Sequence, residues 1–189
     1  MRQFFSPSLS YGRHSGPPHP ATKQAAVMIL LERRENGFQI PLTVRPQHLP
    51  DHPGQISFPG GRLEGREAYA DAARREFEEE LGVSPFPGQI LGELEPVFVY
   101  NSDYFVKPFV AICDEQLAYL PCPHEVERII HLRVDDLMND QHYVQRPFAR
   151  GRVSWQAKTI RVGDDYIWGA TAIMLGELSA VLRDIKWSH

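Results

Sequence analysis

The amino-acid sequence predicts an α/β or α+β fold in which helices flank a mixed central sheet. Residues 25–31 form a continuous apolar run of strand length, and the Asn-Gly turn that follows favours a hairpin with a returning strand at 38–45. Residues 67–81 are rich in alanine and glutamate, which are strong helix formers. Residues 168–183 have the pattern of a final amphipathic helix. Strands and helices in this order predict helices packed on a sheet.

The remaining elements follow from turn residues and apolar runs. A loop rich in proline, histidine and glycine lies at 46–54, and Pro59-Gly60-Gly61 is predicted as a turn. The helix should end at Leu81, because Gly82 stands where a glycine commonly caps a helix. Further strands are expected at 55–58, 90–100, 105–113 and 129–134, with two or three more inside 141–167.

The chain is expected to form one domain, residues 23–189, preceded by an irregular arm. With 189 residues it can bury a full hydrophobic core, and it shows no internal repeat or linker. Residues 1–22 carry four prolines among small and polar residues, at Pro7, Pro17, Pro18 and Pro20. Such an arm packs either on its own domain or on the partner subunit of a homodimer, and the sequence leaves both open.

Composition narrows the class of function. The formal net charge of -4 argues against a nucleic-acid-binding surface, because phosphate backbones select basic patches. No apolar stretch approaches the roughly 20 residues needed to span a bilayer, and the first ten residues lack a secretory apolar region. Cys113 and Cys122 lack metal-ligand spacing, and a chain of this size needs no disulfide, so we expect a reducing, cytoplasmic setting. The expected partner is a small molecule.

Three glutamates of the predicted helix indicate a metal site. Glu76, Glu79 and Glu80 share one face, because residues three and four apart are neighbours on a helix. Carboxylates so close repel one another unless a cation lies between them. Hard oxygen ligands suit Mg²⁺ or Mn²⁺, and Mg²⁺ favours a few carboxylates together with substrate phosphates. Arg75 can reach back along the helix and orient these carboxylates.

A run of glutamates on a helix is usually only a solvated face. The interpretation as a metal site therefore depends on the whole pattern of residues. Gly60 and Gly61 let the loop before the helix fold tightly, which allows a carbonyl to complete a metal's coordination. Fixed residue types stand at fixed distances through the segment: Gly61, Glu67, Arg75, Glu76, Glu79, Glu80 and Gly82. This spacing resembles the Nudix box, with Phe77 at a position that is more often aliphatic. Residues 24–185 are therefore identified as a member of the Nudix hydrolase superfamily.

The resemblance implies a Nudix-type α/β/α sandwich and metal-dependent hydrolysis of a phosphoanhydride bond. Position by position, it implies three glutamate metal ligands with the carbonyl of Gly60 beside them: Glu76, Glu79 and Glu80. Glu79 and Arg75 count among the catalytic residues, Arg75 by orienting the carboxylates. Glu67 is implied as a structural or outer-sphere member.

The general base of this superfamily varies and can lie outside the box. Glu125, in the loop before the strand predicted at 129–134, is the candidate. A solvated loop glutamate is an equally good interpretation of the same residue. Glu127 and Asp103 are weaker candidates.

The segment upstream of the box is similar to the extra motif of the coenzyme A pyrophosphatase branch. The similarity holds at Leu42, Thr43, Arg45, Gly54, Phe58, Pro59, Gly60 and Gly61, and extends to 106–110 and 167–172. Pro41 replaces a leucine of that motif, Pro46 a small residue and Pro50 an arginine. Pro50 removes a cation that could pair with a substrate phosphate. Three side chains are candidates to replace it: His48, His52 and Arg62.

This branch implies hydrolysis of coenzyme A or an acyl derivative to 3′,5′-ADP and a 4′-phosphopantetheine. Four residues are then expected to bind substrate: Arg45, His52, Phe58 and Arg62. Three rings are candidates to stack on adenine, although core packing is the commoner role of such rings: Tyr100, Tyr104 and Trp155. Two alternatives stay open. One is a Nudix hydrolase of another nucleoside diphosphate derivative, such as ADP-ribose, a dinucleotide or a nucleoside triphosphate, and the other is a non-catalytic Nudix-fold binding module.

Overall fold

The computed structural model describes residues 19, 21–49 and 52–187, so the predicted arm at 1–22 lies almost wholly outside the described residues. Its strands are β1 (Lys23–Arg34), β2 (Gly37–Val44), β3 (Ile56–Ser57), β4 (Gly60–Arg62), β5 (Gln89–Glu93), β6 (Val97–Val99), β7 (Tyr104–Cys113), β8 (Arg128–Arg133), β9 (Tyr143–Arg150), β10 (Val153–Val162) and β11 (Asp165–Ile167). Its helices are α2 (Tyr69–Leu81), α3 (Val134–Met138) and α4 (Gly169–Asp184), with a 3₁₀ turn, η2 (Asp140–His142).

The main sheet is built around β1. Its strands follow the order β3-β2-β1-β7-β5, with β4 beside β1, β6 beside β7 and β8 beside β2. β1 runs parallel to β7 along its length and antiparallel to β2 and β4. A strand buried on both faces reads as a continuous apolar run, which explains residues 25–31. The predicted mixed sheet is confirmed.

Two strands, β2 and β4, pair with the same edge of β1. Near its end, residues 32–34 pair with the start of β2, and near its beginning residues 25–27 pair with β4. The predicted turn at 59–61 is therefore wrong, since Gly60 and Gly61 lie in a short strand. A Cβ at Gly60 would lie 2.4 Å from the carbonyl oxygen of Ala26, so this pairing requires glycine. β4 thereby brings the glycine pair next to the central strand.

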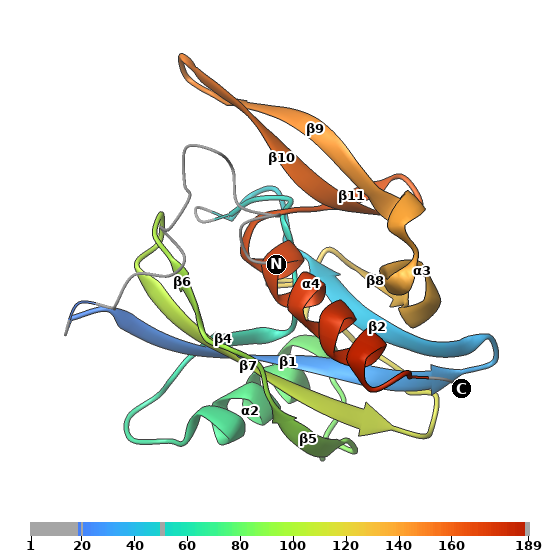
Figure 1. The fold of residues 1–189 in the computed structure, drawn as a ribbon. Helices are drawn as coiled ribbons and strands as arrows, with labels where there is room; N and C mark the ends of the chain where they lie inside the picture. Colours follow the sequence, from blue (N-terminus) through green and yellow to red (C-terminus); the bar gives the residue numbers. More distant parts are fainter. Residues whose placement is uncertain (1–18, 20, 50–51, 188–189) are drawn as a thin grey trace.

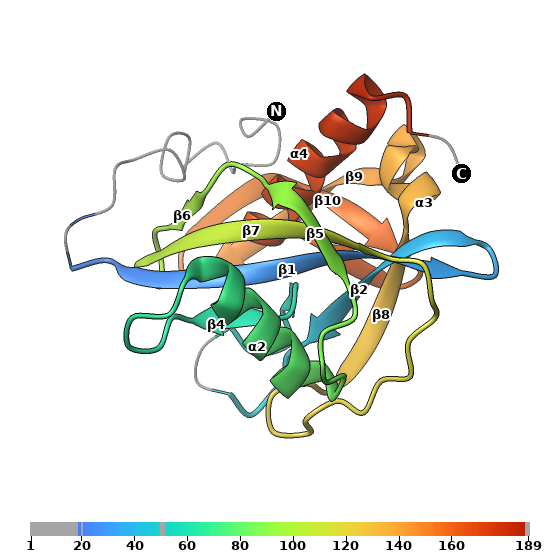
Figure 2. The same ribbon diagram turned by 90° about the horizontal axis from the view of Figure 1, so that it is seen from below.

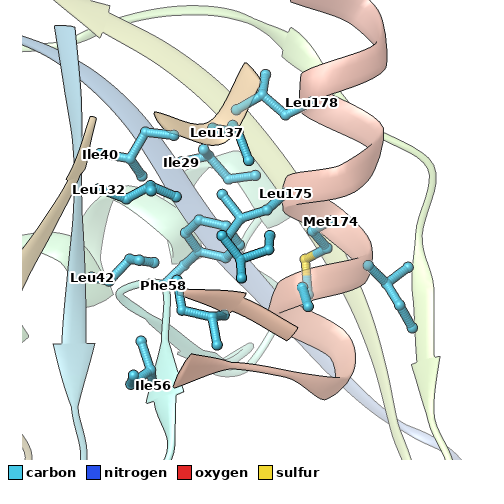
Figure 3. Close-up of a cluster of buried hydrophobic side chains, with 14 of the residues drawn as sticks. Ile29, Ile40, Leu42, Ile56, Phe58, Leu132, Leu137, Met174, Leu175 and Leu178 are labelled. Atoms are coloured by element: carbon cyan, nitrogen blue, oxygen red, sulfur yellow. The ribbon is translucent and has the colours of Figure 1, made fainter. Parts of the chain in front are cut away.

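Helices cover both faces of the main sheet. One set of alternating β1 residues, including Met28 and Leu30, packs with α2. The other set, including Ile29 and Leu31, packs with α4 in a larger cluster, part of which is drawn in Figure 3. Figure 2 shows α2 and α4 on opposite sides of β1 and β7. The expected α/β/α arrangement follows from the period-two alternation of β1.

A second, three-stranded sheet follows the main one. β9, β10 and β11 form an antiparallel meander on the opposite side of the molecule from α2 (Figure 1). The guanidinium of Arg128 on β8 joins the two sheets through two hydrogen bonds to the carboxylate of Asp165, of 2.6 and 2.9 Å. The sequence predicted two or three strands in this region but not that they form a separate sheet.

Some element boundaries differ from prediction. The helix predicted from 67 begins at Tyr69, and the strand predicted at 90–100 is divided into β5 and β6. The division follows a register shift between Ile90 and Gly92, and Pro96 has no amide hydrogen to donate. The short α3 and η2 were not predicted. Within the described residues, no helix combines the length and apolar character that crossing a membrane would need.

Candidate active site

Helix α2 presents a buried apolar face to the sheet and carries the glutamates beside it. Four of its side chains are fully buried: Ala72, Ala73, Phe77 and Leu81. Gly82 ends the helix in the left-handed conformation (φ 67°, ψ 28°), and its amide donates to the carbonyl of Glu78. The predicted glycine cap is confirmed.

Glu80 is the most unusual carboxylate of the molecule's described part. Its side chain is 5% exposed, and its Oε2 has no hydrogen-bond partner within the described residues. Burial, together with the charges of Glu76 and Glu125, raises the pKa of Glu80 to about 8. The positive charge of Arg45 and a hydrogen bond from the backbone of Gly60 act in the opposite direction. A buried oxygen without a donor is costly unless a ligand engages it.

Glu76 lies against the glycine pair. A Cβ on Gly61 would lie 2.4 Å from the carboxyl carbon of Glu76, so only glycine leaves room for this side chain. Burial raises the pKa of Glu76, Arg75 lowers it, and the charges of Glu79 and Glu125 raise it. The charge of Glu76 in turn raises the pKa of Glu80.

Arg75 holds the surrounding carboxylates by a fork of hydrogen bonds. Its Nη2 donates to Glu67 at 2.8 Å, and its Nη1 donates to Glu76 at 2.9 Å and to Glu79 at 3.0 Å. Nη2 also donates to the carbonyl of Arg62 at 3.1 Å, which fastens α2 to β4. The bond to Glu67 is the main cause that raises the pKa of Arg75. This geometry suits the orienting role that the resemblance implies for Arg75.

Glu67 joins the loop before the helix to Arg75. Its carboxylate accepts from Arg75 and from the backbone amide of Glu64 at 2.6 Å, and both bonds lower the pKa of Glu67. Because this side chain is committed to the loop and Arg75, the helix begins only after Ala68. The position of Glu67 suits a structural role.

The three box glutamates are less closely gathered than their helical spacing suggested. Glu79 is more than half exposed and turns toward Arg75, as does Glu76. Within the part of the chain that the structure describes, no three acidic, histidine or cysteine side chains are grouped closely enough to form a metal cage. The guanidinium of Arg75 supplies the positive charge that draws these carboxylates toward it.

The donor set nevertheless fits a divalent cation. The charges of Glu76 and Glu125 raise the pKa of Glu80, and the charge of Glu125 raises that of Glu76. Within the described residues, Glu80 also has a carboxylate oxygen without a hydrogen-bond donor. Hard oxygen donors that repel one another form the environment that Mg²⁺ and Mn²⁺ prefer. Nudix hydrolases generally use divalent metal ions.

Glu125 is brought to the site by a long loop between β7 and β8. Its charge raises the pKa of both Glu76 and Glu80, so residues 45 apart in sequence meet at one place. The weaker candidates have other contacts: the carboxylate of Asp103 accepts from the hydroxyl of Thr22 at 3.1 Å, and the amide of Glu127 donates to the carbonyl of Val44 at 2.8 Å.

Two of the four expected substrate residues, Arg45 and Arg62, contact groups of this region, while His52 and Phe58 have other contacts. Arg45 acts on Glu80, Arg62 lies on β4 beside Arg75, and Nδ1 of His52 lies 2.9 Å from Oε1 of Gln55. Phe58 is only 2% exposed and packs in the core with Leu42 and Met174 (Figure 3). In this position the Phe58 ring, which was expected to bind substrate, is covered by the core.

The rings considered for adenine stacking already contact other groups. Trp155 stacks on Phe148 with centroids 6.0 Å apart, Tyr104 receives the ammonium of Lys23 over its ring, and Tyr100 lies edge-on to Phe98. For Tyr104, partly buried against the core, packing is the role that the structure supports. Tyr100 is the most exposed of the three.

The contact between the β7–β8 loop and α2 was missed by the sequence analysis. Within residues 114–127, the amide of Leu120 donates to the carbonyl of Leu81, and that of Cys122 to the carbonyl of Glu80, both at 2.9 Å. The available signal was the length of this segment, since long irregular loops in compact domains are commonly functional. Cys113 and Cys122 are both free.

Comparison with known proteins places these features in a family. The model of the NUDIX domain matches residues 22–151. Relatives named as uncharacterized Nudix hydrolase NudL are 34% identical over 164 residues in Enterobacter sp. (strain 638) and 32% identical over 158 residues in Escherichia coli (strain K12). Each alignment covers 83% of this chain and 81% of the relative.

Solved structures share the fold at lower sequence identity. The Nudix hydrolase RenU of M. smegmatis matches with a TM-score of 0.61 and 16% identity, over 89% of this chain and 90% of RenU. The MutT protein of Methanosarcina mazei Go1 matches with a TM-score of 0.57 and 17% identity, over 89% of this chain and 100% of its own. With its box glutamates, its glycine pair and these matches, the chain belongs to the Nudix hydrolase family.

Proposed function

We propose that this protein hydrolyses the diphosphate bond of coenzyme A or an acyl derivative. It belongs to the Nudix hydrolases, a family that acts on nucleoside diphosphate derivatives. The products are 3′,5′-ADP and a 4′-phosphopantetheine, and the reaction uses Mg²⁺ or Mn²⁺. The position of Arg45 carries the proposal. This arginine of the upstream motif lies close enough to the Glu80 carboxyl to lower its pKa, so the motif that resembles the coenzyme A branch reaches the candidate metal site.

Each residue of the site has a role in this proposal. Glu76, Glu79 and Glu80, with the carbonyl of Gly60, would hold the cation. When bound, a divalent cation neutralises charge on the diphosphate oxygens and favours ionisation of water. Arg75 orients the glutamates through its three carboxylate contacts. Arg62, on β4, and His52 would bind the substrate.

The chain's own groups then move the proton and stabilise the charge. Glu125, exposed on its loop and within the field of Glu76 and Glu80, accepts a proton from the attacking water. The water oxygen bonds to one phosphorus and the bridging P–O bond breaks. Arg45 stabilises the negative charge on the departing phosphate, because a fixed guanidinium is well placed for an oxyanion.

The proposal is tested by identifying products after hydrolysis in ¹⁸O-water. Coenzyme A, an acyl-coenzyme A, ADP-ribose, a dinucleotide and a nucleoside triphosphate are incubated separately with Mg²⁺ or Mn²⁺. We expect coenzyme A to give the two products above, with ¹⁸O in one phosphate only, which identifies the phosphorus attacked. Equal or faster turnover of ADP-ribose would overturn the coenzyme A assignment while leaving the hydrolase assignment intact.

Variants test the metal site itself. We expect Glu80→Gln and Glu79→Gln to lower kcat by about 10²–10³-fold, because each removes a charge that serves the transition state through the cation. Both should remain folded, since glutamine has the same shape. Glu64→Gln is the matched control, because this exposed box residue contributes only backbone atoms to the site. Full turnover by Glu80→Gln would favour a non-catalytic binding module or a different centre.

A further inference from the structure

The β7–β8 loop, residues 114–127, is fastened to the sheet by a buried glutamate of β1. The side chain of Glu32 is fully buried. Its Oε1 accepts from the amide of Leu117 at 2.8 Å, and its Oε2 accepts from the hydroxyl of Tyr119 at 2.9 Å. Both donors belong to the loop. A buried carboxylate is costly without such partners, so the contacts are part of how the chain folds here.

Two further side chains, Arg34 and His131, lie beside the carboxyl group of Glu32. Nη1 of Arg34 lies 3.4 Å from Oε2 of Glu32, and Nε2 of His131 lies 3.7 Å from the same oxygen. Burial and the charge of Arg34 lower the pKa of His131 to about 4, so His131 is neutral at pH 7. Arg34 thus supplies positive charge to a carboxylate whose two oxygens are occupied by loop donors.

Beyond Tyr119 the loop follows the end of α2. The amides of Leu120 and Cys122 bond to the carbonyls of Leu81 and Glu80, which the helix leaves unpaired at its end. A Cβ on Gly82 would lie 2.2 Å from the carbonyl oxygen of Leu120, so the glycine that caps the helix also admits the loop.

The loop then turns and delivers Glu125. The amides of Glu125 and Val126 both donate to the carbonyl of Cys122, at 3.1 and 2.8 Å, which closes a tight turn. The carbonyl of Glu80 holds the start of this turn through the amide of Cys122, and the carbonyl of Val44 holds its end through the amide of Glu127. The charge of Glu125 then acts on Glu76 and Glu80.

We propose that Glu32 is a positioning residue which, through the Leu117 amide and the Tyr119 hydroxyl, fixes the β7–β8 loop so that Glu125 stands beside Glu76 and Glu80. The inference rests on the proposed function, in which Glu125 takes the proton from water. Glu32 touches neither metal nor substrate in this account. Its effect passes along the loop backbone, and small displacements of a catalytic group are costly: about 1 Å can cost about 10²-fold in rate.

A double-mutant cycle on kcat tests the proposal with the substrate of the panel that turns over fastest. Glu32→Gln keeps the shape but offers one acceptor oxygen to two donors. We expect kcat to fall about tenfold to a hundredfold, with KM changed less than about twofold. Glu125→Gln should lower kcat about 10²–10⁴-fold. The double variant should be no slower than Glu125→Gln alone, because a residue that acts only through Glu125 has nothing left to position.

Two further variants keep the test independent of folding. Tyr119→Phe removes only the hydroxyl that donates to Glu32, and should show a smaller loss of kcat with the same lack of additivity. It replaces Glu32→Gln in the cycle if the latter does not fold. Glu35→Gln, an exposed glutamate in the nearby hairpin turn, is the matched control and should keep wild-type kcat. Tyr166→Phe is the equivalent control on the second sheet.

The outcomes separate this inference from the proposed function. Wild-type kcat in folded Glu32→Gln, or a loss that multiplies with that of Glu125→Gln, overturns the positioning role alone. Wild-type kcat in Glu125→Gln overturns the assignment of the base, and the positioning role with it. A loss in Glu32→Gln that disappears in the Glu125→Gln background supports both.

Discussion

Glu80 shows at the scale of one residue how a metal site is built into a hydrophobic layer. Its neighbours on α2, Phe77 and Leu81, are fully buried, so the helix carries Glu80 into the same dry environment. The Glu80 carboxylate accepts a hydrogen bond from the backbone of Gly60, and within the described part of the chain its Oε2 has no donor. The residue is stable there as a neutral acid, or as a carboxylate with a cation.

Metal affinity should therefore depend on pH through Glu80. Its pKa in the folded chain is about 8, above the ordinary 4.5, and a cation binds the ionised form. Below pH 8 a proton must be displaced, so we expect Mn²⁺ affinity to fall by up to about tenfold for each pH unit, and to level off above pH 8. Calorimetric titration with Mn²⁺ between pH 6 and pH 9 measures this. Glu80→Gln should bind more weakly with a shallower pH dependence, and equal wild-type affinity at pH 6.5 and 8.5 would contradict the argument.

The raised pKa of Glu80 also makes the stability of the metal-free protein depend on pH. Between about pH 4.5 and about pH 8 the folded chain keeps the Glu80 proton that the unfolded chain releases. The free energy of unfolding contributed by this group therefore falls as pH rises through that range, and is constant above it. Glu80→Gln, which cannot ionise, should lack this fall.

At the scale of elements, the end of α2 is where helix, glycine and loop depend on one another. Gly82 has a positive φ, caps the helix and leaves space for Leu120. A non-glycine residue in the left-handed conformation costs about 1–3 kcal/mol. Gly82→Ala should lower the free energy of unfolding by more than this, because its Cβ also meets the Leu120 carbonyl. It should lower kcat as well, since the loop that carries Glu125 must move.

Gly65→Ala is the matched control for that variant. Gly65 also has a positive φ (55°), but beyond Gly65 itself and its two chain neighbours no atom of the described residues lies within 4 Å of the position its Cβ would take. Gly65→Ala therefore measures only the loss of stability from placing alanine in a left-handed backbone conformation. Urea unfolding of both variants measures the difference, and equal losses of stability would show that the loop contact contributes nothing.

The elements that the sequence predicted well are those with strong local patterns. The hairpin of β1 and β2 and the helix at 69–81 follow from an Asn-Gly turn, helix-forming residues and a capping glycine. β4 was predicted as a turn because two glycines and a proline look like one in sequence. Its strand conformation comes from pairing with β1, which no local preference encodes.

At the scale of the whole molecule, the two helical layers have different roles: one carries the carboxylates of the site, and the other mainly stabilises the fold. α2 holds the carboxylates on one face of the sheet, while α4 covers the other (Figures 1 and 2). Leu175 of α4 is fully buried in the larger cluster. Leu175→Ala should lower the free energy of unfolding by about 2–5 kcal/mol while leaving kcat unchanged at temperatures where the variant is folded. A loss of kcat comparable to that of Glu80→Gln would show that the layers are not independent.

The sequence by itself determined the glutamate helix, its glycine cap, the strands of highest apolar content and the membership in the Nudix family. These features are encoded by residue spacing, which acts over a few turns or strands. The tertiary structure alone decided that Phe58 lies in the core, that Arg75 draws Glu79 toward itself, and that Glu32 fastens the loop bearing Glu125. Burial and long-range hydrogen bonds depend on which segments meet in space, and one-dimensional spacing does not record that.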